Sequence, residues 1–169
     1  MNFKWLSVVA VAVLFFTAVA DDLIVNGDFT QMRGALAVNW VKVGKADIAF
    51  QKYENRSCVV FSGNNTKGAS SLRQSLAKKA FPGKKYRLSA AVRGENFQAA
   101  DYGVLLINTN WRGNVGIRRF QLRSDGQWRN LSKVVTVPAS WTSVTAVIFT
   151  VDQRGKFYVA DFKCEPVAE

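Results

Sequence analysis

Residues 23–30 read Leu-Ile-Val-Asn-Gly-Asp-Phe-Thr, and the rest of the chain is organised around this stretch. Its first three residues are apolar and predict a short β-strand. The Asn-Gly-Asp that follows is turn chemistry, in which Gly27 can adopt a positive φ without steric cost. Phe29 then returns to the core. We therefore expect the strands downstream to dock against this first one.

The dominant hydrophobic period after residue 30 is two, which is typical of half-buried strands. Residues 85–93 give the clearest case, because Tyr86, Leu88, Ala90 and Val92 share one face. We expect about eleven short strands with turn signals between them, the signature of a sandwich or barrel. They are predicted at residues 23–25, 37–43, 47–53, 57–61, 71–76, 85–93, 102–108, 116–123, 128–137, 143–151 and 156–163.

The first twenty residues predict a secretory signal peptide. Lys4 gives a positive start, residues 6–19 are an apolar run, and Ala-Val-Ala at residues 18–20 is a cleavage signal. The alternative is a membrane anchor, but a span needs about 20 apolar residues and this run is shorter. We expect a secreted, extracellular protein whose single domain covers residues 21–169, with no transmembrane segment after the signal.

The formal net charge is +11, and Lys4 contributes one unit of it. Such a chain attracts polyanions over about 8 Å at physiological salt. The candidates are acidic polysaccharides, an anionic cell surface or nucleic acid, and export argues against nucleic acid. The alternative is that the charge only keeps a secreted β-protein soluble.

Two cysteines, Cys58 and Cys164, follow the signal segment. Export predicts that they form one disulfide, which would close a loop of roughly 100 residues. The alternative is a pair of buried free thiols. The chain has no His, so one cysteine pair cannot be completed into a tetrahedral zinc site.

Four motifs, in order along the chain, resemble the xylanase/cellulase-type carbohydrate-binding modules. They are the opening stretch, residues 71–76 followed by Pro-Gly-Lys-Lys-Tyr-Arg-Leu-Ser-Ala at residues 82–90, Trp128 with Val-Thr-Val-Pro at residues 135–138, and Gly-Lys-Phe-Tyr-Val-Ala-Asp-Phe at residues 155–162. The resemblance implies an all-β jelly-roll sandwich of two antiparallel sheets, of the galactose-binding-like group. It also implies that the protein binds sugars.

Members of that family commonly hold a structural calcium ion between the first turn and the last strand. The matching positions here are Thr30 and Asp161, and Ala160 stands where the family has another Asp. One carboxylate is therefore missing, whereas calcium takes six to eight oxygens. The resemblance leaves a calcium site open, and the alternative is that Asp161 caps the opening turn by hydrogen bonds.

Trp111 is the candidate platform on which a sugar ring would stack. Its neighbours in residues 108–114 are polar or small, so burying it would bury unpaired backbone groups as well. The alternative is a lid over one end of the core. Trp40 and Trp128 are predicted to be core residues, and Trp141 to cover an end of the sandwich.

Two rows of polar side chains are the candidate ligand-binding surface. Arg87 and Arg93 lie on one face of one predicted strand, and Arg119, Gln121 and Arg123 lie on one face of another. If both rows line the concave cleft of the family, the cleft is cationic. Arg binds carboxylate and sulfate bidentately, so uronic or sulfated glycans would fit better than neutral ones. The alternative is a solvated convex face.

The residues argue against catalysis. Without His there is no Ser-His, Cys-His or His-metal mechanism, and the acids form no recognisable pair. A polysaccharide lyase with Tyr102 as base is the least favoured reading. We expect a non-catalytic carbohydrate-binding protein, with a glycoside-active enzyme as a candidate partner. The alternative is a secreted structural or interaction protein that binds a protein partner or an anionic surface.

Three N-glycosylation sequons begin at Asn55, Asn64 and Asn130. They would be modified only in a eukaryotic secretory pathway, and they identify no organism.

Overall fold

The computed structural model describes residues 21–76, 82–108, 113–122 and 125–167, so the predicted signal peptide lies outside the described residues. The described part contains ten strands and no helix, hence no helix able to cross a membrane. The strands are β1 (Met32–Arg33), β2 (Leu36–Ala37), β3 (Val41–Val43), β4 (Asp47–Tyr53), β5 (Arg56–Ser75), β6 (Lys85–Gln98), β7 (Asp101–Asn108), β8 (Asn114–Arg118), β9 (Arg129–Thr136) and β10 (Val144–Pro166).

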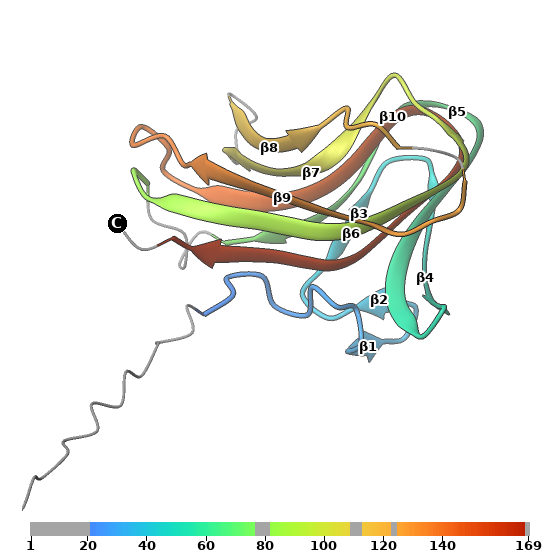
Figure 1. The fold of residues 1–169 in the computed structure, drawn as a ribbon, viewed down its shortest axis with the longest axis horizontal. Helices are drawn as coiled ribbons and strands as arrows, with labels where there is room; N and C mark the ends of the chain where they lie inside the picture. Colours follow the sequence, from blue (N-terminus) through green and yellow to red (C-terminus); the bar gives the residue numbers. More distant parts are fainter. Residues whose placement is uncertain (1–20, 77–81, 109–112, 123–124, 168–169) are drawn as a thin grey trace, which may run out of the picture.

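The fold is built on the long antiparallel pair of β5 and β10. The pair runs from Val59 opposite Val159 to Ser75 opposite Thr145, with register shifts between Val151 and Gly155. At these shifts both strands bend from one layer of the molecule into the other (Figure 1). Residues 152–155, between two strands predicted from the sequence, read Asp-Gln-Arg-Gly and lie inside the continuous strand β10.

The bend creates two antiparallel layers. In the first layer, β4 and β6 flank the halves of β5 and β10 nearest Arg56 and Pro166, and β9 pairs with β6. In the second layer, β3 and β7 flank the other halves, and β8 pairs with β7. Figure 1 shows β7 and β8 in one layer and β6 and β9 in the other. The predicted jelly-roll sandwich is confirmed.

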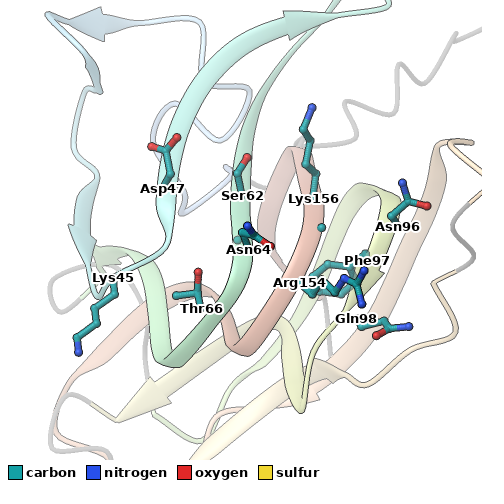
Figure 2. Close-up of a pocket in the computed structure, with 12 residues that line it drawn as sticks. Lys45, Asp47, Ser62, Asn64, Thr66, Asn96, Phe97, Gln98, Arg154 and Lys156 are labelled. Carbon is teal, nitrogen blue, oxygen red and sulfur yellow. The ribbon is translucent and has the colours of Figure 1, made fainter.

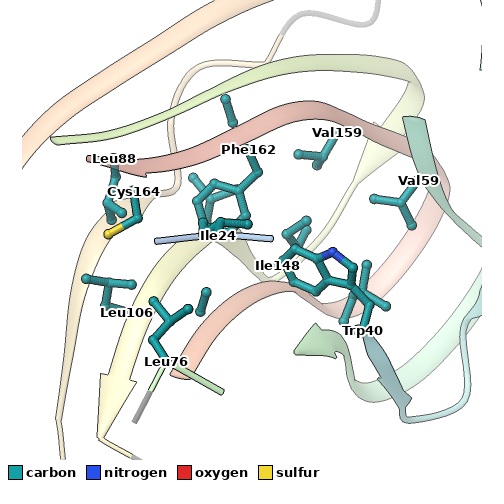
Figure 3. Packing of buried hydrophobic residues seen from close by; sticks show 14 of the residues in the cluster. Ile24, Trp40, Val59, Leu76, Leu88, Leu106, Ile148, Val159, Phe162 and Cys164 are labelled. Carbon is teal, nitrogen blue, oxygen red and sulfur yellow. The ribbon is translucent and has the colours of Figure 1, made fainter. Parts of the chain in front are cut away.

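The hydrophobic core lies between the two layers (Figure 3). The alternation predicted for β6 is confirmed, because Tyr86, Leu88, Ala90 and Val92 are all buried in this core. Leu106 and Ile148 pack on them from the second layer. Trp40 is 4% exposed and Trp141 6% exposed, and both belong to the same cluster.

The opening stretch differs from its prediction, since residues 23–25 form bends and a turn instead of a strand. The stretch is still tied to β10, because the Leu23 amide donates to the Cys164 carbonyl (2.9 Å) and the Phe162 amide donates to the Gly27 carbonyl (3.0 Å). The positive φ values of this turn belong to Asn26 and Phe29, both at 55°. Gly27 is needed for another reason: a Cβ there would collide with the Phe162 carbonyl oxygen.

Left-handed residues explain two further differences in strand boundaries. Asn39, with φ of 70°, divides the predicted strand at residues 37–43 into β2 and β3. Arg119, with φ of 47°, ends β8 at Arg118, well before the predicted end at residue 123. In contrast, residues 62–68, which lie between the predicted strands at residues 57–61 and 71–76, continue β5 because they pair with β10 around the bend.

The predicted disulfide is wrong, because Cys58 and Cys164 are both free and buried. Cys164 lies in the core, whereas Cys58 lies in a separate cluster with Tyr158. Val59 pairs with Val159, so the antiparallel register puts Cys58 opposite Ala160, four residues before Cys164 on β10, which is roughly 13 Å at about 3.3 Å per residue. A disulfide needs Cα atoms within about 7 Å. Burial raises the pKa of Cys58 to about 11 and of Cys164 to about 12, so both thiols stay protonated.

Candidate functional site

A cavity of about 980 Å³ lies at the bend of the sandwich, and we call it the end cavity (Figure 2). Most of the described side chains that line it carry polar groups: three amides, two hydroxyls, three cations and one carboxylate. The lining residues are Lys45, Asp47, Ser62, Gly63, Asn64, Thr66, Asn96, Phe97, Gln98, Arg154, Gly155 and Lys156.

The strand register explains why polar groups gather at this place. Asp47 on β4 and Lys156 on β10 both pair with Ser62 on β5. The next residues along two of these strands, Ile48 and Phe157, are buried in the core. Because side chains alternate along a strand, the row through Asp47, Ser62 and Lys156 faces outward. Beyond this row the chain bends, with φ of 47° at Asn96 and 77° at Gly155.

The end cavity is electropositive. Lys45, Arg154 and Lys156 are exposed, and Asp47 is the one acid among the described residues that line it. The Nζ atom of Lys156 lies 3.7 Å from Oε2 of Glu95, just outside the lining. The cavity therefore has unneutralised positive charge available to a ligand.

Glu95 is held ionised beneath the cavity. Burial by itself would raise the pKa of Glu95, but the hydrogen bonds from the Tyr158 hydroxyl (2.9 Å) and from Nη2 of Arg93 (2.7 Å) outweigh it and lower that pKa. The carboxylate thus bridges Arg93 to Lys156.

Aromatic stacking is not what this cavity offers. Phe97 is its one described aromatic lining residue, and it is 7% exposed. Its ring stacks on Phe157 (centroids 5.2 Å apart) and meets Tyr102 edge-on (5.0 Å). The arrangement suits ligands recognised by hydrogen bonds and charge.

Arg93 is a structural residue in this fold. It is 6% exposed, and Nη1 and Nη2 donate to Glu54 (3.1 Å) and Glu95 (2.7 Å). Its Cζ lies 3.9 Å from the centroid of the Tyr53 ring. We call Arg93, Glu54, Glu95, Tyr53 and Tyr158 the Arg93 cluster; it lies on the outer face of the first layer. Arg87 shares that face but is exposed and pairs across the ladder with Glu165.

The described residues of the second predicted row, Arg119 and Gln121, follow β8 and do not lie on a strand. A cleft shared by the two rows stays a prediction. Arg119 follows β8 directly, and its Nε donates to Oδ1 of Asp101 (3.3 Å). Arg118 also pairs with Asp101. Gln121 is exposed, whereas Arg123 and Trp111 lie outside the described residues.

Tyr102 is partly buried and packs against the core. Its hydroxyl donates to the Phe120 carbonyl, and its ring packs edge-on against Phe120 and Phe157. Burial raises the pKa of this phenol. Trp128 was predicted to be a core residue, but it packs on the outer cluster, with its ring 6.4 Å from that of Tyr158.

The residues proposed for calcium do not form a ready oxygen cage. Asp161 pairs with Arg56 (2.9 Å), which already balances its charge. The Thr30 hydroxyl donates to Oδ2 of Asp28 (3.0 Å). Asp22, Asp28 and Asp161 line one cavity of about 290 Å³, and Thr30 is not among its lining residues. Across the described ranges no group of three or more acids or cysteines is placed to hold a metal ion. Calcium binding stays a prediction.

Sequence reasoning missed most of the end cavity. Residues 62–68 and residues 152–155 each lie between two predicted strands, so each was treated only as a connection. The signal that could have found the site is their shared chemistry: two polar segments, each with an amide, a glycine and a cation, on strands that pair with each other.

No family model and no curated protein sequence matches this chain. Solved structures do match in fold. The CBM22-1 xylan-binding domain of Paenibacillus barcinonensis Xyn10C aligns with a TM-score of 0.63 and 13% identity, over 89% of this chain and 97% of that one. A family 4 carbohydrate-binding module aligns with a TM-score of 0.62 and 14% identity, over 85% of this chain and 99% of that one. The chain has the jelly-roll fold of these carbohydrate-binding modules.

An enzymatically active domain of tailspike protein 4 from bacteriophage CBA120 also aligns, with a TM-score of 0.63 and 11% identity. The alignment covers 86% of this chain but only 21% of the tailspike chain, so this chain spans about a fifth of that protein.

Proposed function

We propose that the protein is a secreted, non-catalytic carbohydrate-binding protein that holds an acidic poly- or oligosaccharide in the end cavity. The observation that carries the proposal is the lining of this cavity, in which three cations and three amides surround one carboxylate. The fold supports it, because solved carbohydrate-binding modules share it, one of them a xylan-binding domain.

The recognition chemistry follows from the side chains. Arg154 can hold a uronate carboxylate or a sulfate through two parallel N–H donors, and Lys45 and Lys156 add point charges. Asn64, Asn96 and Gln98 each present a donor and an acceptor for sugar hydroxyls. A neutral glycan would use the amides alone and would bind more weakly.

Binding without catalysis fits the same site. Among the residues that the structure describes, one carboxylate lines the end cavity, whereas glycoside hydrolysis uses two. The sequence has no His, and the Tyr102 phenol that a lyase would need is bonded to a backbone carbonyl. The likeness in fold to an enzymatically active tailspike domain is the argument for an enzymatic alternative, of which we keep the lyase. A glycoside-active enzyme is the partner we propose for such a module.

One observation favours the alternative of a protein partner. Val41 is 61% exposed and Val43 39% exposed on β3, at an edge of the second layer. Exposed apolar side chains grouped on one strand are typical of protein interaction sites. A partner docked there would leave the end cavity open.

A binding panel tests the proposal. Neutral xylan, polygalacturonate and a sulfated galactan are compared at low and physiological salt, with the wild type and Arg154→Ala. We expect the acidic polymers to bind, binding to weaken with salt, and Arg154→Ala to lose about tenfold in affinity, as for a lost charged hydrogen bond. Binding to none of the polymers would leave the protein-partner alternative.

A further inference from the structure

The three sequons lie in the same layer of the sandwich. Asn55 is in the turn between β4 and β5, Asn64 is in the bend of β5, and Asn130 is on β9 opposite Ala91. All three asparagines are exposed. β4, β9 and this part of β5 form the first layer, so the second layer carries no sequon among its described residues.

Asn64 differs from the other two because it lines the end cavity (Figure 2). The next residue, Asn65, has φ of 58°, so Asn64 stands at a tight, outward-facing bend. Thr66, whose hydroxyl completes the sequon, lines the same cavity. A sugar attached to Asn64 would therefore begin at the cavity wall.

We propose that Asn64 is an N-glycosylation acceptor in a eukaryotic secretory pathway and that a glycan there closes the end cavity to external polysaccharides, so that the form which binds polysaccharide is the one with unmodified Asn64. The second half of this statement rests on the proposed function, and the first half does not. The modification makes the binding capacity of the end cavity depend on the secretory pathway through which the chain passes.

The chemistry of attachment is that of the host's transferase. The bond from the anomeric carbon of an N-acetylglucosamine to a lipid diphosphate oxygen breaks, and a bond from that carbon to Nδ2 of Asn64 forms. The amide loses one proton as the lipid diphosphate leaves. The donor is a lipid-linked oligosaccharide, which the structure need not hold.

The first arm of the test measures occupancy. The full chain is expressed in cultured insect cells and collected from the medium, and the peptide that contains Asn64 is examined by mass spectrometry. We expect a hexosamine-based glycan on Asn64, retained in Thr66→Ser and absent from Thr66→Ala. A secreted chain with bare Asn64, or a chain that is never exported, would overturn the proposal.

The second arm measures binding to polygalacturonate. Wild type from insect cells is expected to bind about tenfold more weakly than wild type from bacteria, and Asn64→Gln from insect cells is expected to bind like the same variant from bacteria. Asn130→Gln from insect cells removes a sequon outside the end cavity, and it should bind as weakly as the insect-cell wild type.

The two arms separate the failures. If Asn64 is glycosylated and the insect-cell wild type binds as tightly as the bacterial protein, the closure is wrong. If the bacterial wild type does not bind any polysaccharide, the proposed function fails, while glycan on Asn64 still supports the modification.

Discussion

Arg93 and Arg154 look alike in the sequence, and the fold gives them opposite environments. Arg93 lies inside the Arg93 cluster, with Glu54 and Glu95 on its guanidinium and the Tyr53 ring beneath it. Arg154 lies at the bend of β10, exposed, on the wall of a cavity whose one lining acid is Asp47. The difference teaches that acidic partners, more than position on a strand, decide whether a cation is available to a ligand.

The largest effect is expected from the removal of Arg93. Arg93→Met leaves two carboxylates facing each other without their shared cation, and we expect a loss of about 3–5 kcal/mol in the free energy of unfolding. Urea denaturation measures it. Arg87→Met, which removes an exposed cation from the same face of β6, should change stability by less than about 0.5 kcal/mol. Equal stability of the two variants would contradict the structural role of Arg93.

The bend that exposes Arg154 depends on Gly155. Its φ is 77°, and a Cβ would collide with the Asn96 carbonyl oxygen. Gly155→Ala should cost about 2–3 kcal/mol and weaken binding, because the wall of the end cavity must move. Gly68→Ala is the matched control, since Gly68 has φ of 89° but open space around it, and it should cost about 1 kcal/mol. Equal costs would show that the close approach at Gly155 does not matter.

Acid should destabilise the Arg93 cluster, because this cluster depends on an ionised Glu95. The pKa of Glu95 is lowered in the folded protein against its ordinary value of 4.5: burial would raise it, but the bonds from Tyr158 and Arg93 prevail. A lowered pKa stabilises the fold above the unfolded value, and this contribution is lost as pH falls through the folded value. The urea concentration at the unfolding midpoint should therefore decrease as the pH is lowered below about 4.5. In Glu95→Gln this decrease should be shallower. If the pH profile of the variant equals that of the wild type, Glu95 does not cause the acid sensitivity.

Tyr102 gives the smallest effect. Tyr102→Phe removes the hydroxyl bonded to the Phe120 carbonyl and keeps the ring packing, so it should cost about 1 kcal/mol in the free energy of unfolding. Binding to polygalacturonate should not change, because Tyr102 does not line the end cavity. If the variant lost most of its binding but kept normal stability, Tyr102 would be a ligand-binding residue.

The sandwich could be predicted because its signals are local. The alternation of Tyr86, Leu88, Ala90 and Val92 predicts a buried face of one strand. The turn residues between strands predict the approximate number of strands. Local signals do not show that β5 and β10 bend together, since extended pairing and turn chemistry coincide at residues 152–155. The disulfide was predicted from export, and it failed because register places Cys58 and Cys164 in different clusters.

The site was harder to predict because it depends on which strands become neighbours. The two arginine rows have the same alternating pattern, yet β6 and β8 belong to different layers. The sequence predicts an exposed cation at Arg93, because it does not show that Glu54, from the β4–β5 turn, lies beside it. The end cavity joins residues from β4, β5, β6 and β10, and no single stretch of sequence contains it.

The most direct test of the central claim compares two variants that each remove one exposed positive charge. Lys156→Met changes the wall of the end cavity, and Arg87→Met changes the outer face of the first layer. Affinity for polygalacturonate is measured by calorimetry at one fixed salt concentration. We expect this affinity to decrease about tenfold in Lys156→Met and less than about twofold in Arg87→Met. Equal losses would show that net charge, and not the end cavity, holds the polymer.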